Sequence, residues 1–219
     1  MTSRTTLSFA EVEAAGLTDW CQLFEALRTR FLTGDFATGL ELVTRIGALA
    51  EAADHHPDVD LRYPHVNITL FSHDVFGVTS RDLALARQIS EAAADLGVSA
   101  DPSTLSVVEI ALDTWDHEEI EPFWRAVLGM QEHPSYDVEL RDLSGSGPTL
   151  WFQETDPHDE PRQRFHLDVR VPADQAGSRI AAALEAGGVL VSEEHAPRFT
   201  VLADAQGNRA CVTTGRGRD

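Results

Sequence analysis

Apolar residues recur at helical spacing in three stretches of the first hundred positions. From Phe36 to Ala53, two apolar rows repeat every three or four residues, which predicts a helix buried over a wide face. Thr79 to Asp82 has the pattern of a capping box, and apolar residues every three or four positions then continue to Leu96, which predicts a second helix. A shorter helix is expected after Ser8.

Alternation with a period of two predicts strands between these helices. Residues Asp19 to Leu32 alternate enough to form a hairpin. Val66 to Leu70 alternates apolar and polar side chains, which indicates a half-buried strand that should end at His73.

A boundary is predicted at residues 98–105, where Gly97 stops a helix and small polar residues and Pro102 follow. Since 219 residues exceed a typical domain of about 100 to 150, we expect two units. In the second, the patterns predict strands at 107–113, 138–141 and 149–153 with a helix at 118–128, then a strand at 165–171, a helix at 174–186 and strands at Val189, Phe199 and Arg209. That order amounts to two successive β-α-β-β-β modules.

Charge and composition exclude several classes of function. The net charge of −19 would repel phosphate backbones and anionic lipid, so neither nucleic acid nor a membrane is an expected partner. The chain contains no lysine, which excludes Schiff-base and Walker-type lysine chemistry. Cys21 and Cys211 lie far apart and suggest neither a disulfide framework nor a cysteine-rich zinc site. This cysteine usage fits a reducing cytoplasm. The first residues show no apolar signal region, and no apolar run approaches the ~18 residues of a membrane span, so we expect a cytoplasmic protein.

Three histidines are the first candidate for chemistry. His55 and His56 follow the predicted long helix, Pro57 fixes its exit, and His73 follows the half-buried strand. Imidazole can give and take protons near neutral pH, so three rings lining one pocket would suit acid/base catalysis. Alternatively, the pair could cap the helix end with His73 on the surface, or the three could hold zinc.

The sequence around these histidines resembles the pterin-4a-carbinolamine dehydratase family. The resemblance covers about residues 8–97, within an expected domain at 1–100, and rests on D-H-H-P from Asp54, I-T-L from Ile68, S-H-D from Ser72 and S-R-D ending at Asp82. It implies dehydration of a 4a-hydroxytetrahydropterin to the quinonoid dihydropterin, without a metal or organic cofactor.

The resemblance also implies roles for individual residues. His55 and His73 would be the acid/base residues, and His56 would bind and orient the pterin. Asp82 matches a functional position of the family, while it could also cap the helix that it begins. The candidates for substrate binding are Asp54, Trp20 and Thr69. Trp20 could equally be a core aromatic residue, and Asp54 either orients an imidazole or is simply solvated.

The second half resembles the glyoxalase/bleomycin-resistance superfamily, also called vicinal oxygen chelate. The resemblance is carried by FWRAVLGM, LWFQ, FHLDVRV and VLADAQGNRACV, which begin at residues 123, 150, 165 and 201, within an expected domain at 105–215. It implies paired modules forming a curved sheet whose cup binds a small molecule.

Active members of that superfamily hold a divalent metal with one residue from each of four strands. The matching positions here are Glu109, Trp151 or Gln153, His166 and Cys211. Trp151 cannot ligate a metal and Cys211 stands where a carboxylate is usual, so we expect no metal, with Glu109 and His166 as weak candidate ligands.

The expected protein is therefore of the α+β class. Its first half should contain a four-stranded antiparallel sheet with helices on one face, and its second half the paired modules. The leading hypothesis is a pterin dehydratase that also binds an unknown small molecule in its second domain and forms a homodimer or a higher homo-oligomer. The alternatives are a non-catalytic dimerisation or binding protein, and a metal-dependent lyase or dioxygenase centred on the second domain.

Overall fold

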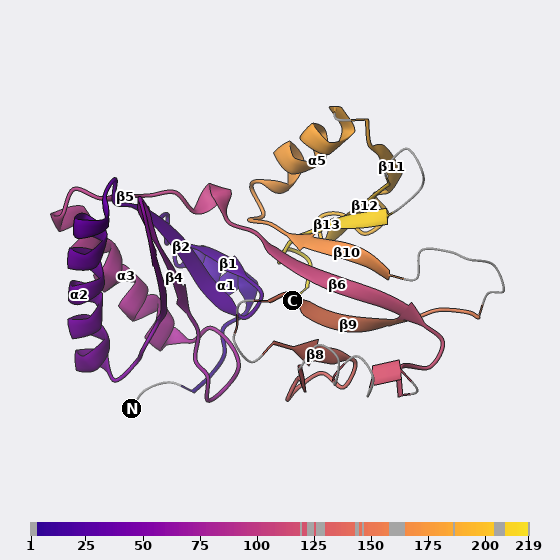
Figure 1. The fold of residues 1–219 in the computed structure, drawn as a ribbon, viewed down its shortest axis with the longest axis horizontal. Coiled ribbons are helices and arrows are strands. Elements are labelled where there is room, and N and C mark those ends of the chain that lie inside the picture. The colour runs from indigo at the N-terminus through magenta and orange to yellow at the C-terminus, as the bar shows by residue number, and fades with distance from the viewer. Residues whose placement is uncertain are drawn as a thin grey trace. The chain divides into compact units, whose positions relative to one another are not determined.

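The chain forms two compact units (Figure 1). The computed structural model describes residues 4–118, 120–121, 125, 130–142, 145, 147–157, 165–185, 187–203 and 209–218. The chain divides after Leu105, and the residues from Gly215 onward group with the first unit. The α+β class and the four-stranded antiparallel sheet expected from the sequence are confirmed.

The first unit is a sheet with the strand order β1-β2-β4-β3, and every pairing in it is antiparallel. A two-residue strand, β5, extends the sheet beside β2. Figure 1 shows α2 and α3 together on one side of this sheet. The elements in chain order are α1 (Phe9–Ala14), β1 (Cys21–Leu23), β2 (Ala26–Leu32), α2 (Phe36–Ala53), β3 (Asp58–Arg62), β4 (His65–Leu70), α3 (Ser80–Asp95), β5 (Ser99–Ala100) and a 3-10 turn (Pro102–Thr104).

The core of this unit lies between the two long helices and the sheet. It is made of fully buried aliphatic and aromatic side chains, chiefly Phe31, Leu42, Ile46, Ile68, Leu70, Leu85 and Ile89. The predicted bounds of α2 and the capping box at Thr79 are confirmed. One expectation is wrong: β4 ends at Leu70 rather than at His73, because a bridge between Ser72 and Gly77 turns the chain first.

Two glycines of α2 provide a test of how closely this helix packs against β3. A methyl group at Gly39 would lie 2.6 Å from Leu61 Cδ1, whereas nothing lies within 4 Å of one at Gly47. We expect Gly47→Ala to raise the free energy of unfolding by about 0.5–1 kcal/mol, because alanine favours the helix. We expect Gly39→Ala to lower it by about 1 kcal/mol, because overpacking outweighs that gain. Urea titrations of the two variants check the opposite signs.

The second unit is an eight-stranded sheet in the order β11-β12-β13-β10-β6-β9-β8-β7. In one module β6 runs parallel to β9, in the other β10 runs parallel to β13, and β6 and β10 pair antiparallel at the centre. In the pairing of their described strands the two modules are therefore equivalent, as expected for two successive modules of the same kind. The elements are β6 (Val107–Thr114), β7 (Gln131–Glu132), β8 (Glu139–Arg141), β9 (Thr149–Glu154), β10 (Phe165–Arg170), α5 (Ala176–Glu185), β11 (Val189–Ser192), β12 (Phe199–Ala203) and β13 (Arg209–Thr213).

Parts of the predicted second unit lie outside the described residues. They include most of the helix expected at 118–128, and with it much of the FWRAVLGM motif, together with the turn at 204–208. Among the helices that the structure describes, none has the length and apolar character needed to cross a membrane.

Candidate functional site

A buried histidine–carboxylate pair joins the end of α2 to the start of α3. His55 Nε2 lies 2.7 Å from Asp82 Oδ1, with His55 8% exposed and Asp82 fully buried. Asp54 ends α2 in the left-handed conformation, at φ 47°, and the His55 N–H then bonds back to the Ala50 carbonyl. This turn directs the His55 ring beneath the helix end, toward α3.

The second oxygen of Asp82 is held by the first turn of its own helix and by the loop after β4. Asp82 Oδ2 accepts from the Thr79 N–H at 2.7 Å, the Ser72 hydroxyl at 2.8 Å and the Thr79 hydroxyl at 3.1 Å. Its position in the first turn also places the negative charge at the positive end of the helix dipole. The capping role that the sequence suggested is confirmed. Oδ1 contacts His55 while Oδ2 caps the helix, so the two contacts of the carboxylate do not compete.

The other two candidate histidines are exposed. His73 lies in the loop after β4, where its ring packs on Phe71 with the ring centroids 3.9 Å apart. The residue before His73, Ser72, donates a hydrogen bond from its hydroxyl to Asp82. His73 is therefore linked to the buried pair through one peptide bond and the side chain of Ser72. His56 turns to solvent, with Nε2 3.1 Å from Glu51 Oε1.

The candidate substrate-binding residues have different surroundings. Trp20 is only 6% exposed, and its indole N–H donates to the Ser90 hydroxyl at 3.0 Å, the contacts of a core aromatic residue. Thr69 is half-buried on β4 and accepts from Arg28 Nη1 at 3.2 Å. Asp54 is exposed, and its left-handed backbone forms the turn that precedes His55.

The positions in the second unit that match the superfamily's metal ligands do not form such a site. Glu109 is buried, and its carboxylate accepts from Arg170 Nη2 at 3.3 Å. The guanidinium of Arg170 therefore occupies the position beside Glu109 where a metal ion would have to bind. Trp151 offers no metal-binding atom. The four-strand ligand set implied by the superfamily does not fit this chain, and no chemistry is assigned through it.

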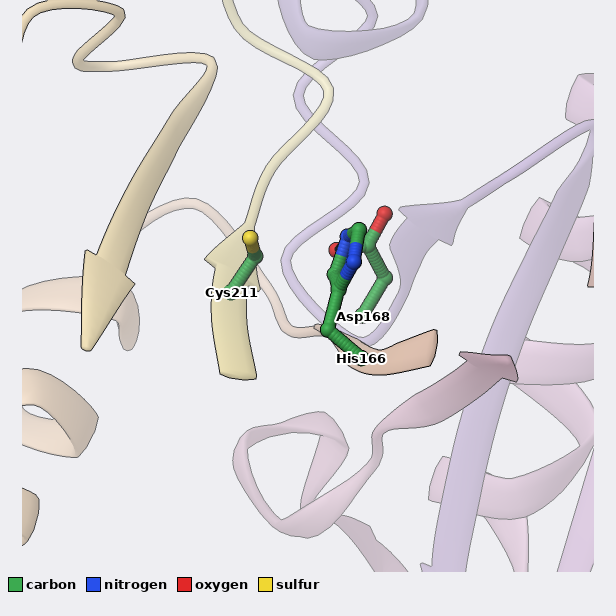
Figure 2. Close-up of side chains that lie close together, drawn as sticks. All are labelled: His166, Asp168 and Cys211. Atoms are coloured by element: carbon green, nitrogen blue, oxygen red, sulfur yellow. Dashed lines mark ion pairs between the residues drawn. The ribbon is translucent and has the colours of Figure 1, made fainter. Parts of the chain in front are cut away.

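A different group of side chains meets on the central strands. His166 and Asp168 on β10 and Cys211 on β13 offer ligand atoms that all lie within 4.8 Å of one another (Figure 2). Interaction with the Asp168 carboxylate raises the pKa of His166, against the opposing effect of burial. Burial, reinforced by Asp168, raises the pKa of the Cys211 thiol to about 12. Sequence reasoning missed Asp168, although it lies within the FHLDVRV segment, because the superfamily resemblance assigns the ligand position on this strand to His166.

Comparison with known proteins finds a separate family match for each of the two units. Residues 5–92 match the family model described as pterin 4 alpha carbinolamine dehydratase, and residues 109–213 match the one described as a glyoxalase-like domain. A protein of Roseiflexus sp. (strain RS-1) named "Putative pterin-4-alpha-carbinolamine dehydratase" is 40% identical over 89 residues, which are 40% of this chain and 96% of that protein. One with the same name from Mycobacteroides abscessus is 41% identical over 75 residues, 34% of this chain and 80% of that protein.

Two solved structures are also similar to parts of the chain. A transcriptional coactivator/pterin dehydratase from Brucella melitensis is 31% identical, with 41% of this chain and 99% of that one covered at a TM-score of 0.39. A glyoxalase/bleomycin resistance protein/dioxygenase superfamily member from Vibrio splendidus 12B01 is 17% identical, with 50% and 99% covered at a TM-score of 0.32.

The chain belongs to the pterin-4a-carbinolamine dehydratase family through its first unit, because it covers nearly all of a relative at 40% identity. Its second unit is a glyoxalase-like domain. Both resemblances seen in the sequence are confirmed.

Proposed function

We propose that the first unit dehydrates 4a-hydroxytetrahydropterin to quinonoid dihydropterin by histidine acid/base catalysis. The observation that carries the proposal is the buried contact between His55 and Asp82, in which the carboxylate's other oxygen is fixed by three donors. Family membership and the named relatives support the same reaction.

The Asp82 carboxylate determines which nitrogen of His55 can accept a proton. An ionised carboxylate is only an acceptor, so a neutral His55 must donate its Nε2 proton to Asp82. The lone pair then lies on Nδ1, which becomes the basic nitrogen of the ring. Asp82 thereby acts as a positioning residue, because it fixes both the orientation of the ring and its tautomer.

The reaction requires one proton to be supplied and one to be removed. An acid protonates the C4a oxygen as the C–O bond breaks and water leaves, while a base removes a proton from ring nitrogen and the freed electron pair forms the new C=N bond. We assign these two roles to His55 and His73. His56, exposed beside them in sequence, would bind the pterin ring or its side chain.

The test is the decay of enzymatically generated 4a-hydroxytetrahydropterin, followed by stopped-flow absorbance. The full chain should accelerate the decay, and His73→Ala should reduce that acceleration about 100-fold or more. His73 is exposed, so its truncation should leave the fold intact, which circular dichroism verifies.

His65→Gln is the matched control within the same unit. His65 begins β4, whereas His73 lies beyond its far end, so the length of the strand, about 17 Å, lies between them. Burial and the nearby Arg30 lower the pKa of His65, which favours its neutral form, and glutamine is a neutral replacement that can still form hydrogen bonds. Retained activity in His65→Gln together with loss in His73→Ala would support the assignment. Equal rates in wild type and His73→Ala would reject it, and a wild type without activity would favour the non-catalytic binding role.

A further inference from the structure

Strand register places three metal-binding side chain types on one face of the second unit. Asp168 on β10 and Cys211 on β13 are direct partners in the parallel ladder. His166 precedes Asp168 by two residues, and residues two apart on a strand project to the same face. Figure 2 shows the three side chains leaving their strands on the same side. Their ligand atoms lie within 4.8 Å of one another, a separation that one metal ion can span.

The buried carboxylate of Asp168 needs a positively charged neighbour. Asp168 is 8% exposed, and among the described residues Oδ1 has no hydrogen-bond partner. Its other register partner, Glu109 on β6, is also buried, and Arg170 bonds to Glu109. The nearest histidine nitrogen, His166 Nε2, is 3.6 Å from Asp168 Oδ1, longer than a good hydrogen bond. A protonated His166 would compensate part of the cost of burying this carboxylate, and a metal cation held between the three side chains would compensate more of it.

We propose that His166, Asp168 and Cys211 bind a divalent transition-metal ion, with zinc as the best match. An imidazole nitrogen, a carboxylate oxygen and a thiolate together suit zinc, whereas magnesium and calcium favour oxygen ligands alone. Three protein ligands leave a fourth position for water or a small molecule, the arrangement of catalytic rather than structural zinc. The His166 side chain is 20% exposed, which leaves that position accessible from solvent.

This ligand set differs from the one that the superfamily resemblance implies. It keeps His166 on β10 and Cys211 on β13. Asp168, two residues after His166 on the same strand, takes the place of the ligands that the superfamily draws from β6 and β9. The replacement follows from this chain's own residues, because Arg170 holds Glu109 on β6. On β9, Trp151 has no ligand atom and Gln153 offers only a weakly donating amide. The first and last strands of the second module, β10 and β13, therefore supply the whole proposed ligand set.

Metal binding must displace protons from this site. The Cys211 thiol has to ionise to become a ligand, and any proton on His166 has to leave. Zinc affinity should therefore rise with pH across the neutral range. The charged groups that surround the three ligands are Asp113 and Glu109 on β6, Arg170 on β10 and Arg209 on β13.

The experiment uses the untagged full chain, freed of metal by a chelator, with zinc or cobalt chloride as the probe. Equilibrium dialysis should show one zinc ion per chain that Cys211→Ser and Asp168→Asn each weaken at least about tenfold. With Co²⁺, the wild type should show the near-ultraviolet absorption of thiolate-to-cobalt charge transfer, and Cys211→Ser should lose it. Asp168→Asn nearly preserves size and shape, so this variant still reports if Cys211→Ser does not fold.

Two controls separate this site from other possible ligands in the chain. Cys21→Ser removes the other thiol, and His73→Ala alters the histidine group of the first unit; both should bind zinc as the wild type does. The proposal is overturned if the wild type binds no zinc at micromolar concentrations. It is equally overturned if Asp168→Asn and Cys211→Ser, folded by circular dichroism, keep wild-type affinity, since a protonated His166 would then be the partner of Asp168.

Discussion

Replacing Asp82 with alanine will lower the free energy of unfolding of the first unit by about 3–5 kcal/mol. The carboxylate is fully buried and accepts from the Thr79 N–H, two hydroxyl groups and His55. Its removal leaves His55 and the helix N–H without their acceptor in the protein interior, and breaking a buried pair from one side has costs of this size. The lost cap adds to the same effect.

Hydrogen exchange of peptides from α3, measured across a urea series, reports this loss for the first unit alone. Asp74→Ala is the matched control, because Asp74 also pairs across the same loop, with Arg81, but is exposed. Exposed ion pairs contribute little, so this control should stay within about 0.5 kcal/mol of the wild type. A loss for Asp82→Ala as small as that of Asp74→Ala would mean that Asp82 does not hold the two elements together.

The elements that sequence reasoning located best are those whose signals are local. The bounds of α2 follow from its apolar rows, the Asp35 cap and the D-H-H-P exit, and the start of α3 follows from its capping box. β3 was not predicted, because four of its five residues are exposed and it therefore shows almost no alternation of buried and exposed positions. β7 has only two residues, too few to show a period.

Contacts between distant segments account for what the sequence could not predict. His55 and Asp82 were both named as candidates, but their pairing depends on how the end of α2 packs against the start of α3. Ser72 was noticed only as part of a motif, and its bond to Asp82 depends on the turn after β4. Asp168 appears in the sequence as one acid among many. Only the register of β10 against β13 places it opposite Cys211.

Asp82→Asn should lower the rate of the proposed reaction strongly while the fold is retained. The Thr79 N–H and the hydroxyl groups require an acceptor, so the single oxygen of the new amide will turn toward them. The amide NH₂ then faces His55 Nε2, which must become the acceptor. His55 is thereby driven to its Nδ1–H tautomer, and the nitrogen proposed to exchange a proton with the pterin no longer has its lone pair. We expect kcat to fall about 100- to 10,000-fold with KM nearly unchanged.

Two measurements distinguish this positioning role from simple damage to the fold. Imidazole ¹⁵N chemical shifts should identify the Nε2–H tautomer of His55 in the wild type and the Nδ1–H tautomer in Asp82→Asn. Asp95→Asn makes the same chemical change at the exposed end of the same helix, so it should keep the wild-type kcat and tautomer. If Asp82→Asn lost kcat while His55 kept its wild-type tautomer, Asp82 would act on the reaction by a different route. A wild-type kcat with a switched tautomer would remove His55 Nδ1 from the proposed mechanism and leave His73 as the remaining acid/base candidate.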